Sequence, residues 1–179
     1  MKQNRKTEIA KATTKDIERL VRFYDELTVF LEDTVNYPVW KKDVYPARHN
    51  ITAAVAGEEL FVLTVDEDIA AAVILNNSQP PEYAYGNWAV KAKDSEILVV
   101  HAMGVHYNFY RCGLASRMME FVCGYAEQCG AKTVRLDAAV GNKPAITLYE
   151  KIGYTYVGET VLQPENEGDI PVRLYELPL

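Results

Sequence analysis

Apolar residues recur with two different spacings along the chain, and these spacings predict helices and strands in turn. Over residues 17–32 they return every three or four positions, which is the period of a helix with one buried face. The run at 97–105 is apolar at nearly every position and predicts a buried strand. Two shorter apolar runs, 60–65 and 69–75, are joined by three acidic residues and predict an antiparallel hairpin.

Similar patterns continue over the rest of the chain. We find no internal repeat, low-complexity tract or linker, so we expect one α/β domain over residues 1–179, with a mixed central sheet flanked by helices. In chain order the expected elements are a strand at 7–12, helices at 17–32 and 46–56, the hairpin at 60–75, a strand at 97–105, a helix ending near 129, a strand at 131–138, a helix between 144 and 152, and closing strands at 154–161 and 172–177 around a polar loop at 164–169.

The segment 76–94 interrupts this alternation. It is polar, contains Pro80 and Pro81, and carries several aromatic residues. Two interpretations remain open: a solvent-facing loop, or a loop whose aromatic side chains form a wall of a substrate pocket.

A glycine-containing loop at 111–116 follows the strand at 97–105 and leads into a helix. The first N–H groups of a helix have no intrahelical partner and lie at the positive end of the helix dipole. Such a loop binds phosphate groups well, so the pattern predicts a candidate phosphate site.

Composition narrows the possible functions only slightly. The net charge of −6 disfavours nucleic acid as the main partner and would suit an amine substrate. No apolar run approaches the roughly 18 residues of a membrane span, and the basic first six residues lack the apolar region of a signal peptide. We therefore expect a cytoplasmic protein that does not bind membranes. Cys112, Cys123 and Cys129 show no Cys-x-x-Cys spacing, so neither a disulfide framework nor a metal site is expected.

Two segments together resemble the signatures of the GNAT family, the Gcn5-related N-acetyltransferases. Residues 105–115 read VHYNFYRCGLA and are similar to the acetyl-CoA-binding motif of that family. Residues 142–154 read NKPAITLYEKIGY and resemble the second signature, Asn-x-x-Ala-x-x-Leu-Tyr-x-x-x-Gly-Phe/Tyr. Their order and separation also agree with the family. The resemblance implies a GNAT-type fold with an acyl-CoA cleft beside the central strand.

The first signature departs from the family pattern at one position. Tyr110 stands where the family has Arg or Gln, and the arginine is displaced by one residue to Arg111. Arg111 could supply the missing charge to the cofactor or could lie in solvent.

The resemblance assigns a set of residues to acetyl-CoA. The backbone of the strand around Met103 and Val105 would pair with the pantetheine arm, and the loop at 111–116 would bind the pyrophosphate. Asn142 would hydrogen-bond the cofactor arm, or cap the following helix, or do both. The expected cofactor-binding residues are Met103, Gly104, Val105, Arg111, Cys112, Gly113, Leu114, Ala115, Ser116 and Asn142.

Tyr149 is the expected general acid of direct acetyl transfer. A free thiol has a pKa of about 8.5 and a tyrosine hydroxyl a pKa of about 10, so a positioned tyrosine can donate a proton to the departing thiolate. The alternative is a tyrosine that only packs its ring in the core. A backbone N–H near Met103 or Gly104 would stabilise the negative charge on the acetyl oxygen.

His101 is the candidate general base, because some family members carry a histidine four residues before the valine of the first signature. Strand alternation is expected to place its side chain on the same face as Met103 and Val105, whereas His106 would face the other way. A structural histidine in an apolar run is the alternative. Glu96, Asp137 and Glu159 also lie near strand ends, and the sequence distinguishes none of them.

These residues indicate an N-acetyltransferase that moves an acetyl group from acetyl-CoA to an amine, either a small molecule or a protein amine. A non-catalytic acyl-CoA sensor is the alternative, and an interaction domain without cofactor is a third possibility. A homodimer is a further expectation from the family. The aromatic residues expected to line the acceptor pocket are Trp40, Tyr45, Tyr83, Tyr85 and Trp88.

Overall fold

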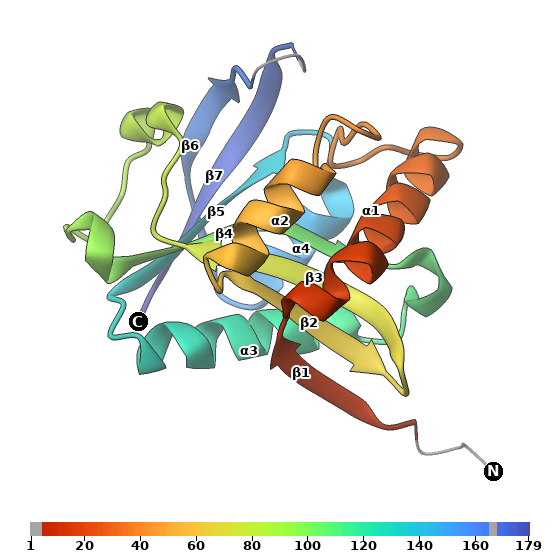
Figure 1. Ribbon diagram of the computed structural model, residues 1–179. Helices are drawn as coiled ribbons and strands as arrows, with labels where there is room; N and C mark the ends of the chain where they lie inside the picture. The colour runs from red at the N-terminus through yellow and green to blue at the C-terminus, as the bar shows by residue number, and fades with distance from the viewer. Residues whose placement is uncertain (1–4, 165–167) are drawn as a thin grey trace.

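The computed structural model of the chain describes residues 5–164 and 168–179, and it contains a seven-stranded mixed sheet in the order β1-β2-β3-β4-β5-β7-β6 (Figure 1). The strands are β1 (Thr7–Lys11), β2 (Leu60–Val65), β3 (Asp68–Asn76), β4 (Ile97–Val105), β5 (Thr133–Ala139), β6 (Thr155–Leu162) and β7 (Ile170–Pro178), and the helices are α1 (Ile17–Glu32), α2 (Arg48–Ala56), α3 (Leu114–Gln128) and α4 (Lys143–Lys151).

The observed elements follow the predicted order, and their bounds differ from the prediction by one or two residues. Helix α2 begins at Arg48 rather than Pro46, because Ala47 has an extended backbone and its N–H donates to Asn50 Oδ1 at 2.9 Å. Strand β7 begins at Ile170, which pairs with Leu162 across the end of the hairpin. The predicted loop at 164–169 is described only in part, since residues 165–167 lie outside the described residues, as do residues 1–4.

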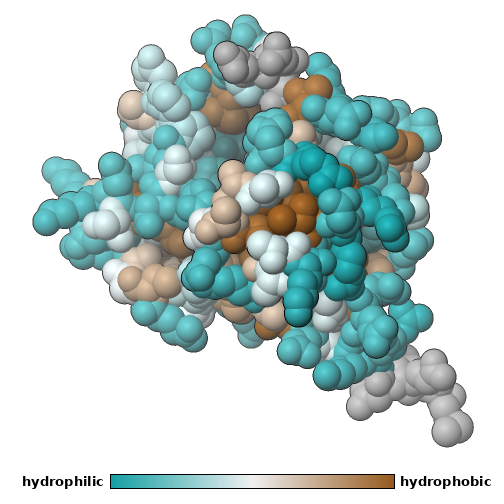
Figure 2. Space-filling view, in the orientation of Figure 1, coloured by the Kyte–Doolittle hydropathy of each residue, from teal (hydrophilic) through white to brown (hydrophobic). Residues whose placement is uncertain are grey.

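Helices α1 and α2 cover one face of the sheet, and α3 and α4 cover the other (Figure 1). The alternation of β2 shows why: Phe61 and Leu63 pack toward α3, whereas Leu60 and Val62 pack toward α1 and α2. Hydrophilic residues cover most of the outer surface on the α1–α2 side, with a small apolar area near its centre (Figure 2). The central strands β2, β3, β4 and β5 are therefore buried on both faces, as their nearly continuous apolar runs predicted.

Strands β4 and β5 separate soon after they meet. They pair in parallel only from Ile97↔Thr133 to Val99↔Arg135. Beyond this point β5 continues its pairing with β7 as far as Ala139↔Val172, and β4 diverges from it. The second half of β4 thus presents a backbone edge toward an opening in the middle of the sheet.

A β-bulge lies in the same half of β4. Gly104 pairs with Ala72 and His101 with Ile74, so two residues of β4 stand opposite one residue of β3. Ala102, the first of these two residues, has a left-handed backbone conformation with φ of 48°. Its carbonyl accepts a hydrogen bond of 2.7 Å from the buried hydroxyl of Tyr24 in α1. The bulge is therefore held from outside the sheet.

This bulge overturns one expectation from the sequence. Met103 and Val105 pack against the core formed with α3, as alternation predicted. His101, in contrast, pairs with Ile74, whose side chain belongs to the α1–α2 core, so the two residues share that face. The prediction that His101 shares a face with Met103 and Val105 is wrong, because the extra residue reverses the alternation between them.

The segment between β3 and β4 is tied firmly to the sheet. A buried ion pair joins Arg135 of β5 to Glu176 of β7, with Nε and Oε1 3.3 Å apart. The second oxygen of Glu176 accepts the Ala89 N–H at 2.7 Å, and the Arg135 guanidinium lies 4.2 Å over the Trp88 ring. The segment is therefore solvent-facing at many of its positions, with Tyr85 75% exposed, but it is fixed to the sheet and its Tyr83 is buried.

Two buried tyrosines provide a stability test of the bulge. The Tyr24→Phe variant should lower the free energy of unfolding by about 1–3 kcal/mol, because the buried Ala102 carbonyl loses its donor. The Tyr154→Phe variant should leave the free energy of unfolding unchanged or raise it, because the buried Tyr154 hydroxyl has no partner among the described residues. Urea denaturation of both variants measures the difference. Equal losses in the two variants would contradict a specific role for the Tyr24 hydroxyl.

Candidate active site

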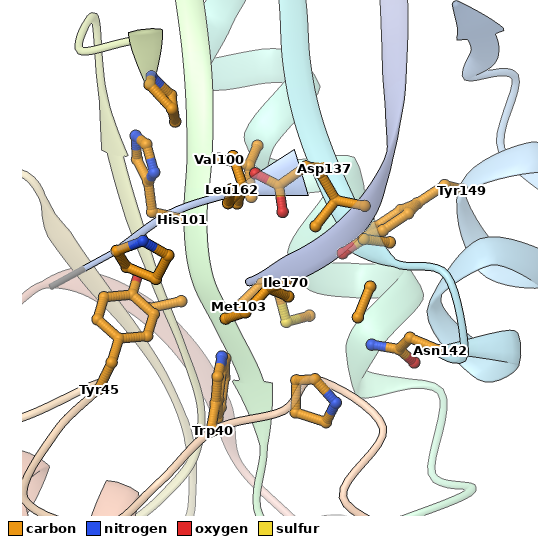
Figure 3. A pocket seen from close by; sticks show the side chains of 17 residues that line it. Trp40, Tyr45, Val100, His101, Met103, Asp137, Asn142, Tyr149, Leu162 and Ile170 are labelled. Carbon is orange, nitrogen blue, oxygen red and sulfur yellow. The ribbon is translucent and has the colours of Figure 1, made fainter. Parts of the chain in front are cut away.

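The opening between β4 and β5 contains a cavity of about 230 Å³. Its walls come from the second half of β4, the end of β5, the N-cap and last turn of α4, the loop between α1 and α2, the β6–β7 hairpin, and Pro80 of the segment between β3 and β4. Figure 3 shows that Trp40, Tyr45 and His101 lie on one side of this cavity and that Tyr149 and Asn142 lie on the other. The cavity therefore joins side chains from distant parts of the sequence.

Tyr149 projects into the cavity from α4. The helix begins where the Asn142 side chain accepts the Ala145 N–H at 3.2 Å, so Asn142 is an N-cap. The Tyr149 side chain is 7% exposed, and its hydroxyl points into the cavity (Figure 3). Burial and the nearby Asp137 carboxyl raise the pKa of Tyr149 above its ordinary value. The hydroxyl consequently keeps its proton throughout the physiological pH range.

Asp137 lies beside Tyr149 at the end of β5, and its carboxyl also points into the cavity (Figure 3). Burial raises the pKa of Asp137 to about 6. The Tyr83 hydroxyl donates a hydrogen bond of 2.8 Å to Asp137 Oδ2 and opposes this rise, because it stabilises the charged form. Asp137 is thus a carboxylate that can gain and lose a proton near neutral pH. The signal in the sequence was an acidic residue inside a predicted strand.

His101 reaches the same cavity from β4, on the side of Tyr45 (Figure 3). Its Nε2 lies 3.0 Å from Asn76 Oδ1. Asn76 donates through Nδ2 to Glu59, and its Oδ1 also accepts the Ser78 N–H, which orients the amide. With this amide orientation, Nε2 of the ring donates to Asn76 Oδ1. Burial lowers the pKa of His101 below its ordinary value.

The candidate phosphate loop lies between the end of β4 and α3. Gly113 precedes the helix with φ of 76°, a conformation that favours glycine, and a Cβ placed there would meet no atom within 4 Å. The first N–H groups of α3 follow directly and face outward from the helix start. Arg111 is exposed, also with positive φ, and no ion pair of its guanidinium occurs among the described residues. The loop therefore offers backbone donors and one available cation.

Aromatic contacts hold this loop on α1. The Phe30 ring stacks on Tyr107 at 4.4 Å and meets Tyr110 edge-on at 6.0 Å. The N–H of Asn108 points at His106 Nδ1, at 3.4 Å, while His106 Nε2 lies 3.1 Å from Glu26 of α1. Tyr110, the residue that replaces the usual Arg or Gln, thus packs against α1.

The structure brings together some of the predicted site residues and separates others. His101, Met103, Asn142 and Tyr149 line the cavity, and so do Trp40 and Tyr45. Gly104 faces α1, where an added Cβ would approach the Trp40 ring to 3.3 Å. Val105, the last residue of β4, packs against the core formed with α3 and does not line the cavity. The remaining predicted residues belong to the loop and the start of α3, where Cys112 is exposed and the Leu114 side chain is buried; they are Arg111, Cys112, Gly113, Leu114, Ala115 and Ser116.

Three predicted pocket aromatics lie outside the cavity lining. These residues are Tyr83, Tyr85 and Trp88. Tyr83 is 2% exposed and its ring packs against the Trp88 ring, whereas Tyr85 is exposed to solvent. The contribution of Tyr83 to the site is its hydrogen bond to Asp137.

Two features are absent from the described part of the chain. Within residues 5–164 and 168–179, no three His, Cys, Asp or Glu side chains gather closely enough to hold a metal ion. In the same residues, no helix combines the length and apolar character needed to cross a membrane.

Comparisons with known proteins agree with this geometry. The family model described as "Acetyltransferase (GNAT) family" matches residues 16–154. The uncharacterized N-acetyltransferase YesJ of Bacillus subtilis is 26% identical over 110 residues, which cover 62% of this chain and 60% of YesJ. The match therefore spans less than two thirds of this curated relative.

Solved structures extend the likeness to almost the whole chain. An acetyltransferase of the GNAT family from Streptococcus agalactiae superposes with a TM-score of 0.77 at 21% identity, covering 97% of this chain and 95% of that one. The structure of yncA from Salmonella typhimurium with its cofactor acetyl-CoA gives a TM-score of 0.69 at 14% identity, covering 97% and 94%. At these identities the likeness shows a common fold.

Proposed function

The chain belongs to the GNAT family of acetyltransferases and has the predicted fold, and we propose that it transfers the acetyl group of acetyl-CoA to the nitrogen of an amine. The observation that carries the proposal is the cavity in which β4, Asp137 and Tyr149 converge, beside the strand that leads to the candidate phosphate loop. In this reaction the amine nitrogen bonds to the acetyl carbon, the carbon–sulfur bond breaks, and one proton is released for each ammonium consumed.

The residues present fit acetyl-CoA. The backbone edge of β4 around Met103 and Val105 has lost β5 as a partner, so it can pair with the amides of a pantetheine arm as an added strand would. The first N–H groups of α3, from Leu114 to Ser116, suit a pyrophosphate. Asn142 already accepts the Ala145 N–H, and its side-chain NH₂ group remains to donate to the cofactor arm.

Tyr149 is the proposed general acid. Its raised pKa keeps the hydroxyl protonated until a strong base appears beside it. A thiolate that leaves in this partly buried cavity is such a base, because it is poorly solvated there. Tyr149 donates its proton to the sulfur and regains one afterwards from solvent.

Asp137 is the proposed acceptor of the amine proton, and His101 is the alternative. With a pKa of about 6, the Asp137 carboxyl is largely ionised at pH 7 and above, and it lies on the same side of the cavity as Tyr149. His101 lines the cavity too, but its Nε2 is engaged with Asn76 and burial disfavours its charged form. The negative charge on the acetyl oxygen would be met by a backbone N–H at the bulge, near Met103 or Gly104.

The non-catalytic sensor is the weaker alternative. A sensor requires the cofactor cleft. It does not require a protonated tyrosine beside a carboxyl of raised pKa in that cleft, and this chain has both. A homodimer stays a prediction.

The test of the proposed function is release of free thiol from acetyl-CoA in the presence of a mixed panel of primary amines, with the acetylated product identified by mass spectrometry. The Tyr149→Phe variant should lower kcat by at least about 100-fold, a typical contribution of general acid catalysis, and leave the Kd for acetyl-CoA within about twofold. Tyr175→Phe is the matched control, because the Tyr175 hydroxyl bonds to Glu150 outside the cavity. An unchanged kcat in Tyr149→Phe, with chemistry shown to limit the rate, would remove Tyr149 from the reaction.

The pH dependence of kcat separates the two candidate bases. If Asp137 is the base, activity of the wild type falls as the pH decreases through about 6, because protonation removes the acceptor. The Tyr83→Phe variant should move this limb to higher pH, since it deletes the hydrogen bond that favours the carboxylate.

The Tyr85→Phe variant should not move the limb, because Tyr85 is exposed on the same segment. A limb that is insensitive to Tyr83→Phe but lost in His101→Gln would assign the base to His101.

A further inference from the structure

We propose that the amine acceptor is a small monoamine with an apolar carbon skeleton, bound between Trp40 and Leu162 with its nitrogen at the Asp137 carboxyl. This inference rests on the proposed acetyl transfer and names the substrate class of the same cavity.

The cavity has two ends of different character. Asn142 and Tyr149 mark the end at which the cofactor arm is proposed to lie, so the acceptor must approach the acetyl carbon from the opposite end. The walls at that opposite end are aromatic, aliphatic or proline side chains: Trp40, Tyr45, Pro80, Leu162, Pro164 and Ile170. Such a surface complements an apolar skeleton, because burial of apolar area is the main favourable interaction between them.

Trp40 forms a rigid part of this surface. The backbone N–H of Trp40 donates to Asn36 Oδ1 at 3.0 Å, and Asn36 Nδ2 donates back to the backbone carbonyl of Trp40. The indole meets the ring of Tyr24 edge-on at 5.9 Å, and the absence of a side chain at Gly104 allows β4 to approach it closely. Because the ring is already fixed, little conformational entropy of Trp40 is lost when a flat or branched apolar group binds against it.

The charges of the lining fit a single ammonium group. Among the lining residues in the described part of the chain, Asp137 is the carboxylate, and its position is fixed by Tyr83. An ammonium at Asp137 would be both bound and placed next to its proton acceptor. A second cationic nitrogen would instead lie against Leu162 or Ile170 and would lose its hydration without a partner.

The size of the cavity limits the acceptor further. A volume of about 230 Å³ lies below the roughly 300–1,000 Å³ typical of pockets for drug-sized ligands, and the acetyl group occupies part of it. A skeleton of the size of 2-phenylethylamine or 3-methylbutylamine fits this limit better than an aminoglycoside.

The first experiment compares kcat/KM for single acceptors at saturating acetyl-CoA. We expect 2-phenylethylamine and 3-methylbutylamine to exceed spermidine, glycine and a short peptide with a free N-terminal alanine by at least about tenfold, since a mispaired charge in an apolar site costs more than 1.4 kcal/mol. Faster turnover of spermidine, glycine or the peptide would overturn the inference and leave the proposed function intact. Failure of every amine, without heat from acetyl-CoA binding in calorimetry, would overturn both.

The second experiment changes the charge of the wall. Leu162→Glu should lower kcat/KM for 2-phenylethylamine at least tenfold and raise the ratio of 1,5-diaminopentane to 2-phenylethylamine turnover. The matched control is Val161→Glu on the same strand, because Val161 is 41% exposed and lies outside the cavity lining. Equal effects of the two substitutions would overturn the inference.

If thermal melts show that Leu162→Glu does not fold, Trp40→Leu takes its place. It should lower kcat/KM for 2-phenylethylamine more than for 3-methylbutylamine, and equal losses would count against an aromatic wall.

Discussion

The separation of β4 from β5 is the constraint on which the rest of the structure depends. Backbone N–H and C=O groups in a buried sheet require partners, and after Val99↔Arg135 the edge of β4 no longer finds them in β5. The bulge at Ala102 changes the direction of β4 at this place, and the Tyr24 hydroxyl satisfies the carbonyl that the bulge turns outward. What remains is a length of backbone that suits an extended ligand rather than another strand. The proposed cofactor cleft is thus a consequence of interrupted pairing.

A buried ion pair links the chemistry to the segment between β3 and β4. Arg135 and Glu176 are 6% and 1% exposed, and both bind backbone groups of that segment in addition to each other. The two buried charges are therefore compensated, and their backbone partners fix the position of the segment. That position brings the Tyr83 hydroxyl to Asp137. Burial alone would raise the pKa of Asp137 further. The hydrogen bond from Tyr83 opposes this rise and keeps the pKa at about 6, so the carboxyl can be ionised at neutral pH.

The elements of the fold followed from the periodicity of the sequence, and the two signatures located Tyr149, Asn142 and the phosphate loop. The features that the sequence did not reveal depend on contacts between distant residues. Ala102 shows no local sign of a bulge, because its partner Tyr24 lies 78 positions away. Asp137 looked like any carboxylate near a strand end until Tyr83, 54 positions away, and the surrounding burial distinguished it. His101 was misplaced for the same reason, since one unseen bulge reverses the alternation of a strand.

Amide hydrogen exchange with and without acetyl-CoA tests most directly whether the edge of β4 and the start of α3 bind the cofactor. Saturating acetyl-CoA should slow exchange at Met103, Val105 and residues 113–116, and should leave edge strand β1 unchanged. Unaltered exchange at these positions, or protection confined to α1, would contradict a cofactor cleft between β4 and β5.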